Sequence, residues 1–161
     1  MAGWNGSNGV AYYTYAMGTN QVKPSTDHFN VALFTNGVNP TQSASVTVNE
    51  YTGAGSTWDT SNETLGTGYT AGGASVTPIT WGQNVNAAGT NVITFTSSGT
   101  PQWTGATFTA YGAFVYNTNP STITNLGISW NWFGGLQQVT AGSFTINWST
   151  SGICTWTTGT N

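Results

Sequence analysis

Charged side chains are nearly absent from this sequence. Its 161 residues include one lysine, no arginine and four carboxylates, so charged residues make up 3% of the chain, against about 25% in an average soluble domain. Nucleic-acid binding is excluded because nothing could neutralise phosphates, and electrostatic attachment to anionic lipid is excluded for the same reason. A surface of Thr, Asn and Ser fits a chain that is packed among other proteins, although a neutral surface adapted to its medium would have the same composition.

Cysteine and long apolar runs are also scarce. Cys154 is the single cysteine, so no disulfide can form within the chain. No apolar run approaches the roughly 18 residues that a membrane helix needs. No basic segment followed by an apolar one opens the chain, as a secretory signal would. We therefore expect a protein without membrane contact that is made and assembled in a cytoplasm.

Titratable groups suited to catalysis or metal binding are few and scattered. His28 is the single histidine, and a pairing with Cys154 is disfavoured because that cysteine lies in an apolar segment typical of a buried, inert thiol. Asp59 and Glu63 share a loop and are one weak candidate for a calcium site, yet they lack the ligand spacing of an EF-hand. We therefore predict no enzymatic activity, no cofactor and no metal.

Aromatic residues, in contrast, are plentiful. The chain has eight Trp, seven Tyr and seven Phe, although hydrophobic residues make up only 37% of it. Because one aromatic ring can bury roughly 150–250 Å², these rings are enough to build the core of one folded domain.

Strict alternation of large apolar and small polar residues predicts β-strands. It runs through 126–133 (LGISWNWF) and 143–148 (SFTINW), and it places Trp130, Trp132 and Trp148 on the core side rather than on an exposed sugar-binding platform. Weaker or shorter strand candidates are 29–35, 46–51, 76–81, 92–96, 107–116 and 152–157.

Glycine-containing turns are predicted to separate these strands. Asn36-Gly37 favours a tight turn, and Gly134-Gly135 and Ala141-Gly142 divide the C-terminal third. The strand spacing predicts an all-β, antiparallel β-sandwich or jelly-roll-like single domain.

The N-terminal region differs from the rest. Residues 1–9 (MAGWNGSNG) read as an N-terminal arm with one large side chain, Trp4, and residues 10–161 as the β-sandwich domain. Segment 10–17 (VAYYTYAM) is followed by Gly18 and favours a short helix, although its β-branched and aromatic content also fits a strand.

Three tryptophans lie outside any clean alternation. They are Trp4, Trp58 and Trp103. Because tryptophan is enriched in protein interfaces, we interpret them as candidates for contact with a partner.

Four segments in this order resemble a family of small virion structural proteins of tailed phages. They are FNVALFTN (29–36), GTGYTAGG (66–73), PQWTGATFTAYGAFVYN (101–117) and LGISWNWFGGLQQVTAGSFTINWSTSGI (126–153). The chain departs from the family pattern in an apparent insertion at 51–65 and in its near lack of charge.

The resemblance implies a non-enzymatic role in the virion. The function that we expect is a capsid decoration (cement) protein on the surface of the phage head, bound to the major capsid protein or to other virion proteins. It also implies a homo-oligomer, with a trimer favoured. A tail, neck or fibre component remains an alternative, as does a carbohydrate-binding module of lectin type.

Overall fold

The structure is a computed structural model, and it describes residues 4, 6–42, 45–85, 91–119 and 123–157. Strands, isolated bridges included, account for 48% of the described residues and helix for 8%. The elements are β1 (Asn8–Gly9), α1 (Ala11–Gly18), β2 (Phe29–Phe34), a 3-10 turn (Thr47–Asn49), β3 (Ala74–Ser75), β4 (Ile79–Val85), β5 (Asn91–Ser97), β6 (Gln102–Asn117), β7 (Gly127–Thr145) and β8 (Cys154–Thr157).

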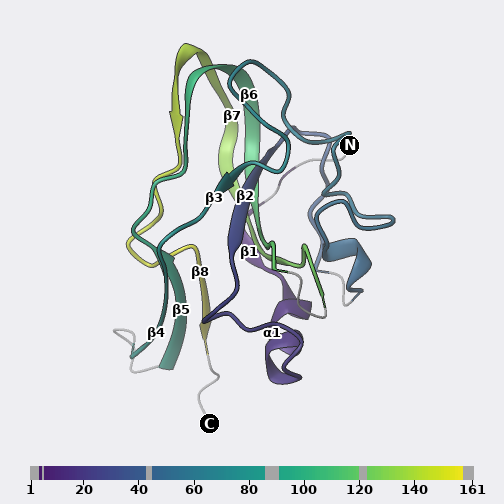
Figure 1. The fold of residues 1–161 in the computed structure, drawn as a ribbon, viewed down its shortest axis with the longest axis vertical. Coiled ribbons are helices and arrows are strands. Elements are labelled where there is room, and N and C mark those ends of the chain that lie inside the picture. Colours follow the sequence, from purple (N-terminus) through teal and green to yellow (C-terminus); the bar gives the residue numbers. More distant parts are fainter. Residues whose placement is uncertain (1–3, 5, 43–44, 86–90, 120–122, 158–161) are drawn as a thin grey trace.

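The strands form two antiparallel sheets (Figure 1). One sheet has five strands in the order β1-β7-β6-β2-β3, and the other has three in the order β4-β5-β8. This confirms the all-β sandwich and the single short helix near the N-terminus. The expected strand at 46–51 is wrong, because its centre forms the 3-10 turn.

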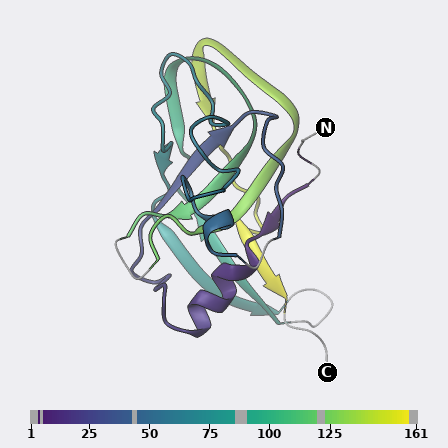
Figure 2. The ribbon, with the colours of Figure 1, turned by 90° about the vertical axis from the view of Figure 1, so that its right-hand side faces the viewer.

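The β6–β7 pair is the longest feature of the fold. Both strands run together over the upper end of the molecule and bend there, opposite the end that carries α1 (Figures 1 and 2). At the bend, Tyr111 of β6 stands against the four β7 residues 133–136, because Ala110 pairs with Gln137 and Gly112 with Trp132. The glycines at 134 and 135 therefore make a bulge inside one strand and not the predicted turn between two. The glycines allow this bulge because Gly134 has φ +82°.

The large sheet is covered on both faces. Residues 29 and 34 of β2 point to opposite faces because their separation is odd. Phe29 contacts Phe95 of the second sheet, with ring centroids 5.0 Å apart. Phe34 contacts Trp58 from the loop after β2, at 5.2 Å. Every residue of β2 except the half-buried Asn30 is buried, so its sequence reads as an apolar run and not as an alternation.

The alternation at 126–133 predicts the core only up to Trp130. That side chain is 4% exposed, whereas Trp132, which was expected to point inward, is 38% exposed. The bulge begins directly after Trp132, and the alternation ends there.

The described part of the predicted arm packs on the domain. Asn8 and Gly9 pair with Trp130 and Ser129 of β7. The Trp4 ring is 7% exposed, and its indole N–H donates to the Thr35 carbonyl oxygen over 2.9 Å. Pairing of β1 with β7 and the contact of Trp4 with Trp58 thus hold this segment against the core.

Candidate interaction surface

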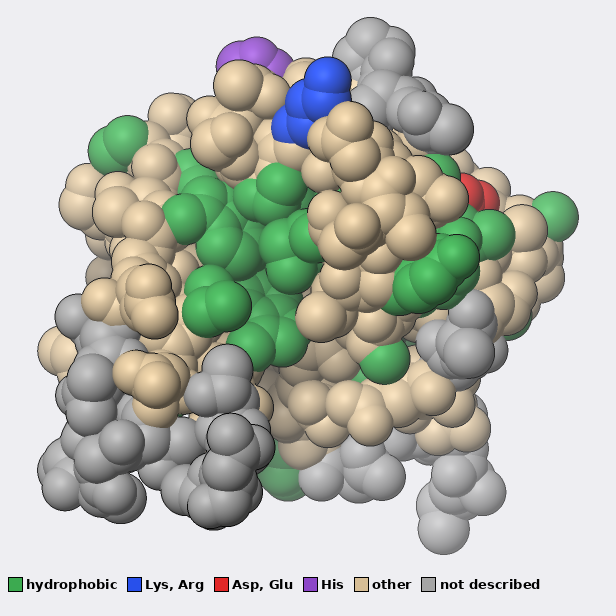
Figure 3. Space-filling view, turned by 90° about the horizontal axis from the view of Figure 1, so that it is seen from below, with side chains coloured by type: hydrophobic (Ala, Val, Ile, Leu, Met, Phe, Trp, Pro, Cys, Tyr) green, Lys and Arg blue, Asp and Glu red, His purple; other side chains and the backbone are tan. Residues whose placement is uncertain are grey.

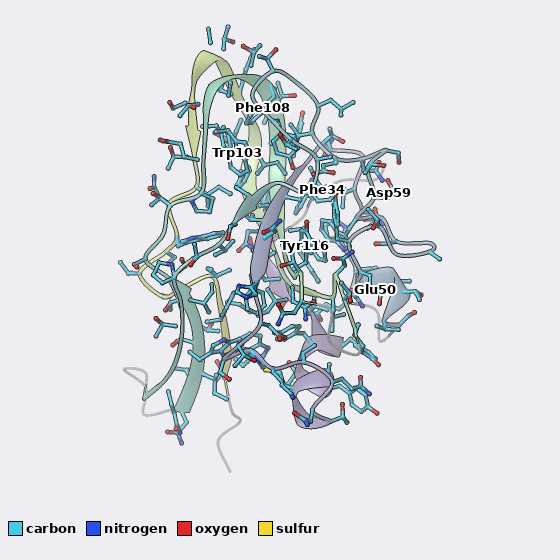
Figure 4. The ribbon with its side chains drawn as sticks, in the orientation of Figure 1. Phe34, Glu50, Asp59, Trp103, Phe108 and Tyr116 are labelled. Carbon is cyan, nitrogen blue, oxygen red and sulfur yellow. The ribbon has the colours of Figure 1, made fainter. Side chains whose placement is uncertain are left out.

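The three tryptophans predicted to meet a partner lie inside the chain. Trp4, Trp58 and Trp103 are 7%, 1% and 6% exposed. Trp4 and Trp58 contact each other, with centroids 5.5 Å apart. Trp103 belongs to a second cluster, where its ring meets Phe108 inside the bent β6–β7 ribbon (Figure 4). Residues outside alternation can therefore be core residues, and these rings are covered in this conformation.

Glu63 is at the centre of a buried polar cluster that no sequence pattern indicated. Its side chain is 2% exposed, and both oxygens accept hydrogen bonds. Oε1 accepts from the Tyr69 hydroxyl at 2.6 Å and from the Gly72 N–H at 2.8 Å. Oε2 accepts from the Tyr51 hydroxyl at 2.8 Å. We call Glu63, Tyr51, Tyr69 and Gly72 the Glu63 cluster.

The Glu63 cluster fastens the long 52–75 loop to the sheet. The Tyr69 hydroxyl also accepts the backbone N–H of Leu33 in β2, at 2.8 Å. The Tyr116 hydroxyl of β6 donates to the Gly72 carbonyl oxygen at 2.8 Å. Burial, and then the hydrogen bond to Glu63, raise the pKa of Tyr69 above its ordinary value. Burial raises the pKa of Tyr116 to about 12. Neutral tyrosines therefore donate to Glu63, and the arrangement is that of a structural joint.

The other titratable groups do not come together in a reactive site. The Asp59 carboxylate accepts from the N–H and hydroxyl of Ser61, at 2.9 and 2.6 Å, and so holds its own turn. The structure therefore gives Asp59 and Glu63 separate partners. Within the described ranges, no three His, Cys, Asp or Glu residues lie close enough to hold a metal ion.

Cys154 is a protonated thiol in a partly buried position. It lines a cavity of about 260 Å³ together with residues of β1 and β7. Burial raises its pKa to about 11, so almost no thiolate is present at neutral pH. His28 is exposed and is not among the residues that line this cavity.

The surface carries even less charge than the sequence implies. Asp27 and Glu63 are buried, at 8% and 2% exposure. The accessible surface of 7968 Å² therefore has only three charged side chains that are at least partly exposed, namely Lys23, Glu50 and Asp59. Seen from the α1 end, apolar side chains gather beside Lys23, the blue residue in Figure 3.

Large apolar side chains are also exposed singly. Among the described residues, those exposed by at least a third are Tyr15 (58%), Leu65 (78%), Ile93 (40%), Trp132 (38%) and Leu136 (50%). Trp132 and Leu136 lie on either side of the glycine bulge in β7. Sequence patterns missed this pair because the bulge interrupts the alternation there.

No family model matches the chain, and no curated protein or solved structure is significantly similar to it. Of the helices in the described ranges, none has the length and apolar character needed to cross a membrane.

Proposed function

We propose that this chain is a non-enzymatic structural protein of a tailed-phage virion, and that it acts as a decoration protein bound to the major capsid protein on the head surface. The observation that carries the proposal is the folded domain's nearly uncharged surface, with three partly exposed charged side chains on 7968 Å². The place in the virion rests on the four segments that resemble phage structural proteins.

A neutral surface sets the kind of contact that such a protein can make. Affinity must come from apolar side chains, backbone groups and the neutral Thr, Asn and Ser hydrogen bonds, because few charges are available for ion pairs. Many copies on a symmetric shell would then add small contacts together, since multivalent attachment compensates for weak single interfaces.

Co-sedimentation with phage particles stripped of their accessory proteins tests this function. We expect the chain to bind heads, and the bound fraction to change less than about twofold between about 0.05 and 0.5 M salt, because screening acts on charges. Electron microscopy of labelled protein then locates it on heads or on tails. Failure to bind any particle would refute the virion role, release by salt would refute the neutral contact, and binding to tails alone would refute the place on the head.

A further inference from the structure

Two neighbouring hollows lie where the edges of the two sheets meet. β1 is an edge strand of the large sheet and β8 of the small one, and the two strands lie side by side (Figures 1 and 2). The first hollow has a volume of about 260 Å³ and the second of about 300 Å³. Asn8, Gly9 and Thr155 line both, so the two hollows adjoin. Since pockets for drug-sized ligands occupy about 300–1,000 Å³, each hollow has room for one ring of a small ligand.

β1 and β8 are too close together for a peptide strand to enter between them. A Cβ built at Gly9 would lie 2.9 Å from the Cys154 Sγ, whereas a strand needs about 4.8 Å to each neighbour. The Gly9 N–H donates to the Asn8 Oδ1 at 2.9 Å, and the Gly9 carbonyl oxygen accepts from the Gln42 Nε2 at 3.3 Å. The hollows therefore suit a ligand that side chains hold, and not one that pairs with the main chain.

The first hollow is lined by neutral groups that can make further hydrogen bonds. Asn131 donates from Nδ2 to the Ser129 hydroxyl at 3.2 Å, and its Oδ1 has no partner among the described residues. The side-chain nitrogen of Asn8 has none either within the ranges that the structure covers. Ser7 Oγ accepts the Trp132 N–H at 2.9 Å and keeps its own hydrogen to donate. The wall of this hollow thus offers amide and hydroxyl groups, both donors and acceptors.

Each hollow also has a tryptophan in its wall. Trp130, 4% exposed, lines the first, and Trp156, which is partly buried, lines the second. The Trp156 ring is stacked on the Trp81 ring, with centroids 5.4 Å apart and an interplanar angle of 19°. Its position is therefore fixed before a ligand arrives, and it gives C–H groups an apolar surface to pack on.

The lining of the hollows decides the class of ligand. None of the lining residues is charged, so an ionic ligand would lose its hydration without gaining a counter-ion. A purely apolar ligand would leave the amide and hydroxyl groups of the wall without partners. A neutral sugar meets both conditions, because its hydroxyl groups lie around the edge of the ring and its C–H groups on the two faces.

We propose that the hollows beside β1 and β8 bind a neutral oligosaccharide, with one sugar ring in each. Asn8, Asn131 and Ser7 bond to the hydroxyl groups of one ring, and the Trp156 ring packs on the other. The site is not the flat tryptophan platform considered from the sequence, since Trp132 and Trp148 do not line it. Sugar binding needs no phage particle, so it can fail while the proposed function holds, and the reverse.

Two-dimensional NMR of the backbone amides, recorded on the full chain, tests the site. The probes are four neutral disaccharides, namely maltose, lactose, cellobiose and N,N′-diacetylchitobiose. Each is added up to about 50 mM, because so small a ligand on a solvated surface is expected to bind in the millimolar range. We expect at least one of them to shift the signals of Gly9, Asn131 and Thr155 in a saturable way. No saturable shift with any of the four, or shifts confined to residues away from the hollows, would overturn the proposal.

Two variants and a matched control locate the binding. Asn131→Leu keeps the size of the side chain without its hydrogen-bonding groups and should weaken the binding at least tenfold. Ser151→Trp places a ring in the first hollow from an exposed position and should weaken it as much. Asn147→Leu is the control, because Asn147 is exposed and lines neither hollow, and it should bind like the wild type.

Circular dichroism should show the same fold for all three variants. If loss of the bond from Asn131 to Ser129 unfolds the first variant, Ser151→Trp at its exposed position decides the test. Sugar binding that survives in the folded Asn131→Leu or Ser151→Trp variant, or that Asn147→Leu weakens as much, would place the ligand elsewhere and overturn the proposal.

Discussion

Removing the Glu63 side chain should destabilise the fold far more than removing that of Asp59. Each carboxylate accepts at least three hydrogen bonds, but Glu63 is 2% exposed and Asp59 is half-buried. Glu63→Ala would leave two tyrosine hydroxyls and the Gly72 N–H without their acceptor. A buried unsatisfied donor costs about 1–3 kcal/mol. Removal of the buried carboxylate charge offsets part of this cost, so we expect the free energy of unfolding to fall by about 3–5 kcal/mol in total.

Asp59→Ala leaves the Ser61 and Asn62 groups that donate to Asp59 free to bond with water. It should lower the free energy of unfolding by about 1 kcal/mol, as the loss of a local capping group does. Urea unfolding followed by tryptophan fluorescence measures both variants. With a slope of about 2 kcal/mol per molar urea, the Glu63 variant should shift the midpoint by about 1.5–2.5 M and the Asp59 variant by about 0.5 M. Equal shifts would refute the argument that burial decides the value of these hydrogen bonds.

Three further expectations concern the aromatic core. Trp58→Ala should lower the free energy of unfolding by about 3–5 kcal/mol and Trp132→Ala by less than about 1 kcal/mol, because Trp58 is 1% and Trp132 38% exposed. Thermal melting measures both variants, and similar melting temperatures would contradict the placing of Trp58 in the core and Trp132 at the surface. Gly112→Ala places a Cβ 2.6 Å from the Trp4 ring, whereas a Cβ at Gly18 has no neighbour within 4 Å. In urea titration, Gly112→Ala should therefore lower the free energy of unfolding by about 1–3 kcal/mol, and Gly18→Ala should not lower it. Deleting residues 1–9 should lower the urea midpoint as well, since it removes the buried Trp4 and all of β1; an unchanged midpoint would restore the interpretation of a free arm.

Local patterns in the sequence were sufficient to predict the fold class. The residues that the alternation in 126–130 and 143–146 places inward are buried at Leu126, Ile128, Trp130 and Ile146 and partly buried at Phe144. Gly127 and Ser129, which it places outward, are buried as well, because the sheet is covered on both faces there. The same rule misjudged Trp132, because a bulge depends on the partner strand and not on the residue alone. In β6, residues 112–117 are all buried, and this run marks a sheet covered on both faces.

Contacts between distant segments were not predictable in this way. The Glu63 cluster joins residues 6 to 12 positions apart, and its link from Tyr69 to Leu33 spans 36. Nothing in a single sequence says that one glutamate among four carboxylates will meet those tyrosines. The place of β1 is equally non-local: this two-residue strand pairs with β7, more than a hundred residues away in the sequence.

The buried tyrosines should make the fold sensitive to alkali. Burial raises the pKa of Tyr13, Tyr51 and Tyr69 well above the ordinary value, and that of Tyr116 to about 12. In the unfolded chain these groups lose their protons near pH 10. Above that pH the folded state holds more protons than the unfolded state, so the free energy of unfolding falls as pH rises. Each tyrosine lowers the free energy of unfolding by up to about 1.4 kcal/mol per pH unit, and the four together by up to about 5.5 kcal/mol per pH unit.

Urea midpoints measured from about pH 8 to about pH 11 test this dependence. We expect the midpoint to fall gently above about pH 8.5, where the Cys154 thiol of the unfolded chain loses its proton while burial raises its pKa in the folded state to about 11. Above about pH 10 the fall should become steep, and the tyrosinate absorbance that Tyr116→Phe removes should appear only on unfolding. Tyr116→Phe should reduce the steepness of the fall above pH 10 by about a quarter, because it removes one of the four tyrosines with a raised pKa. Tyr15→Phe, at a side chain 58% exposed, should leave the steepness unchanged. If the tyrosinate absorbance that Tyr116→Phe removes forms in the folded protein near pH 10, or if the midpoint stays level to pH 11, water reaches these buried hydroxyls and the cluster is not the closed joint described above.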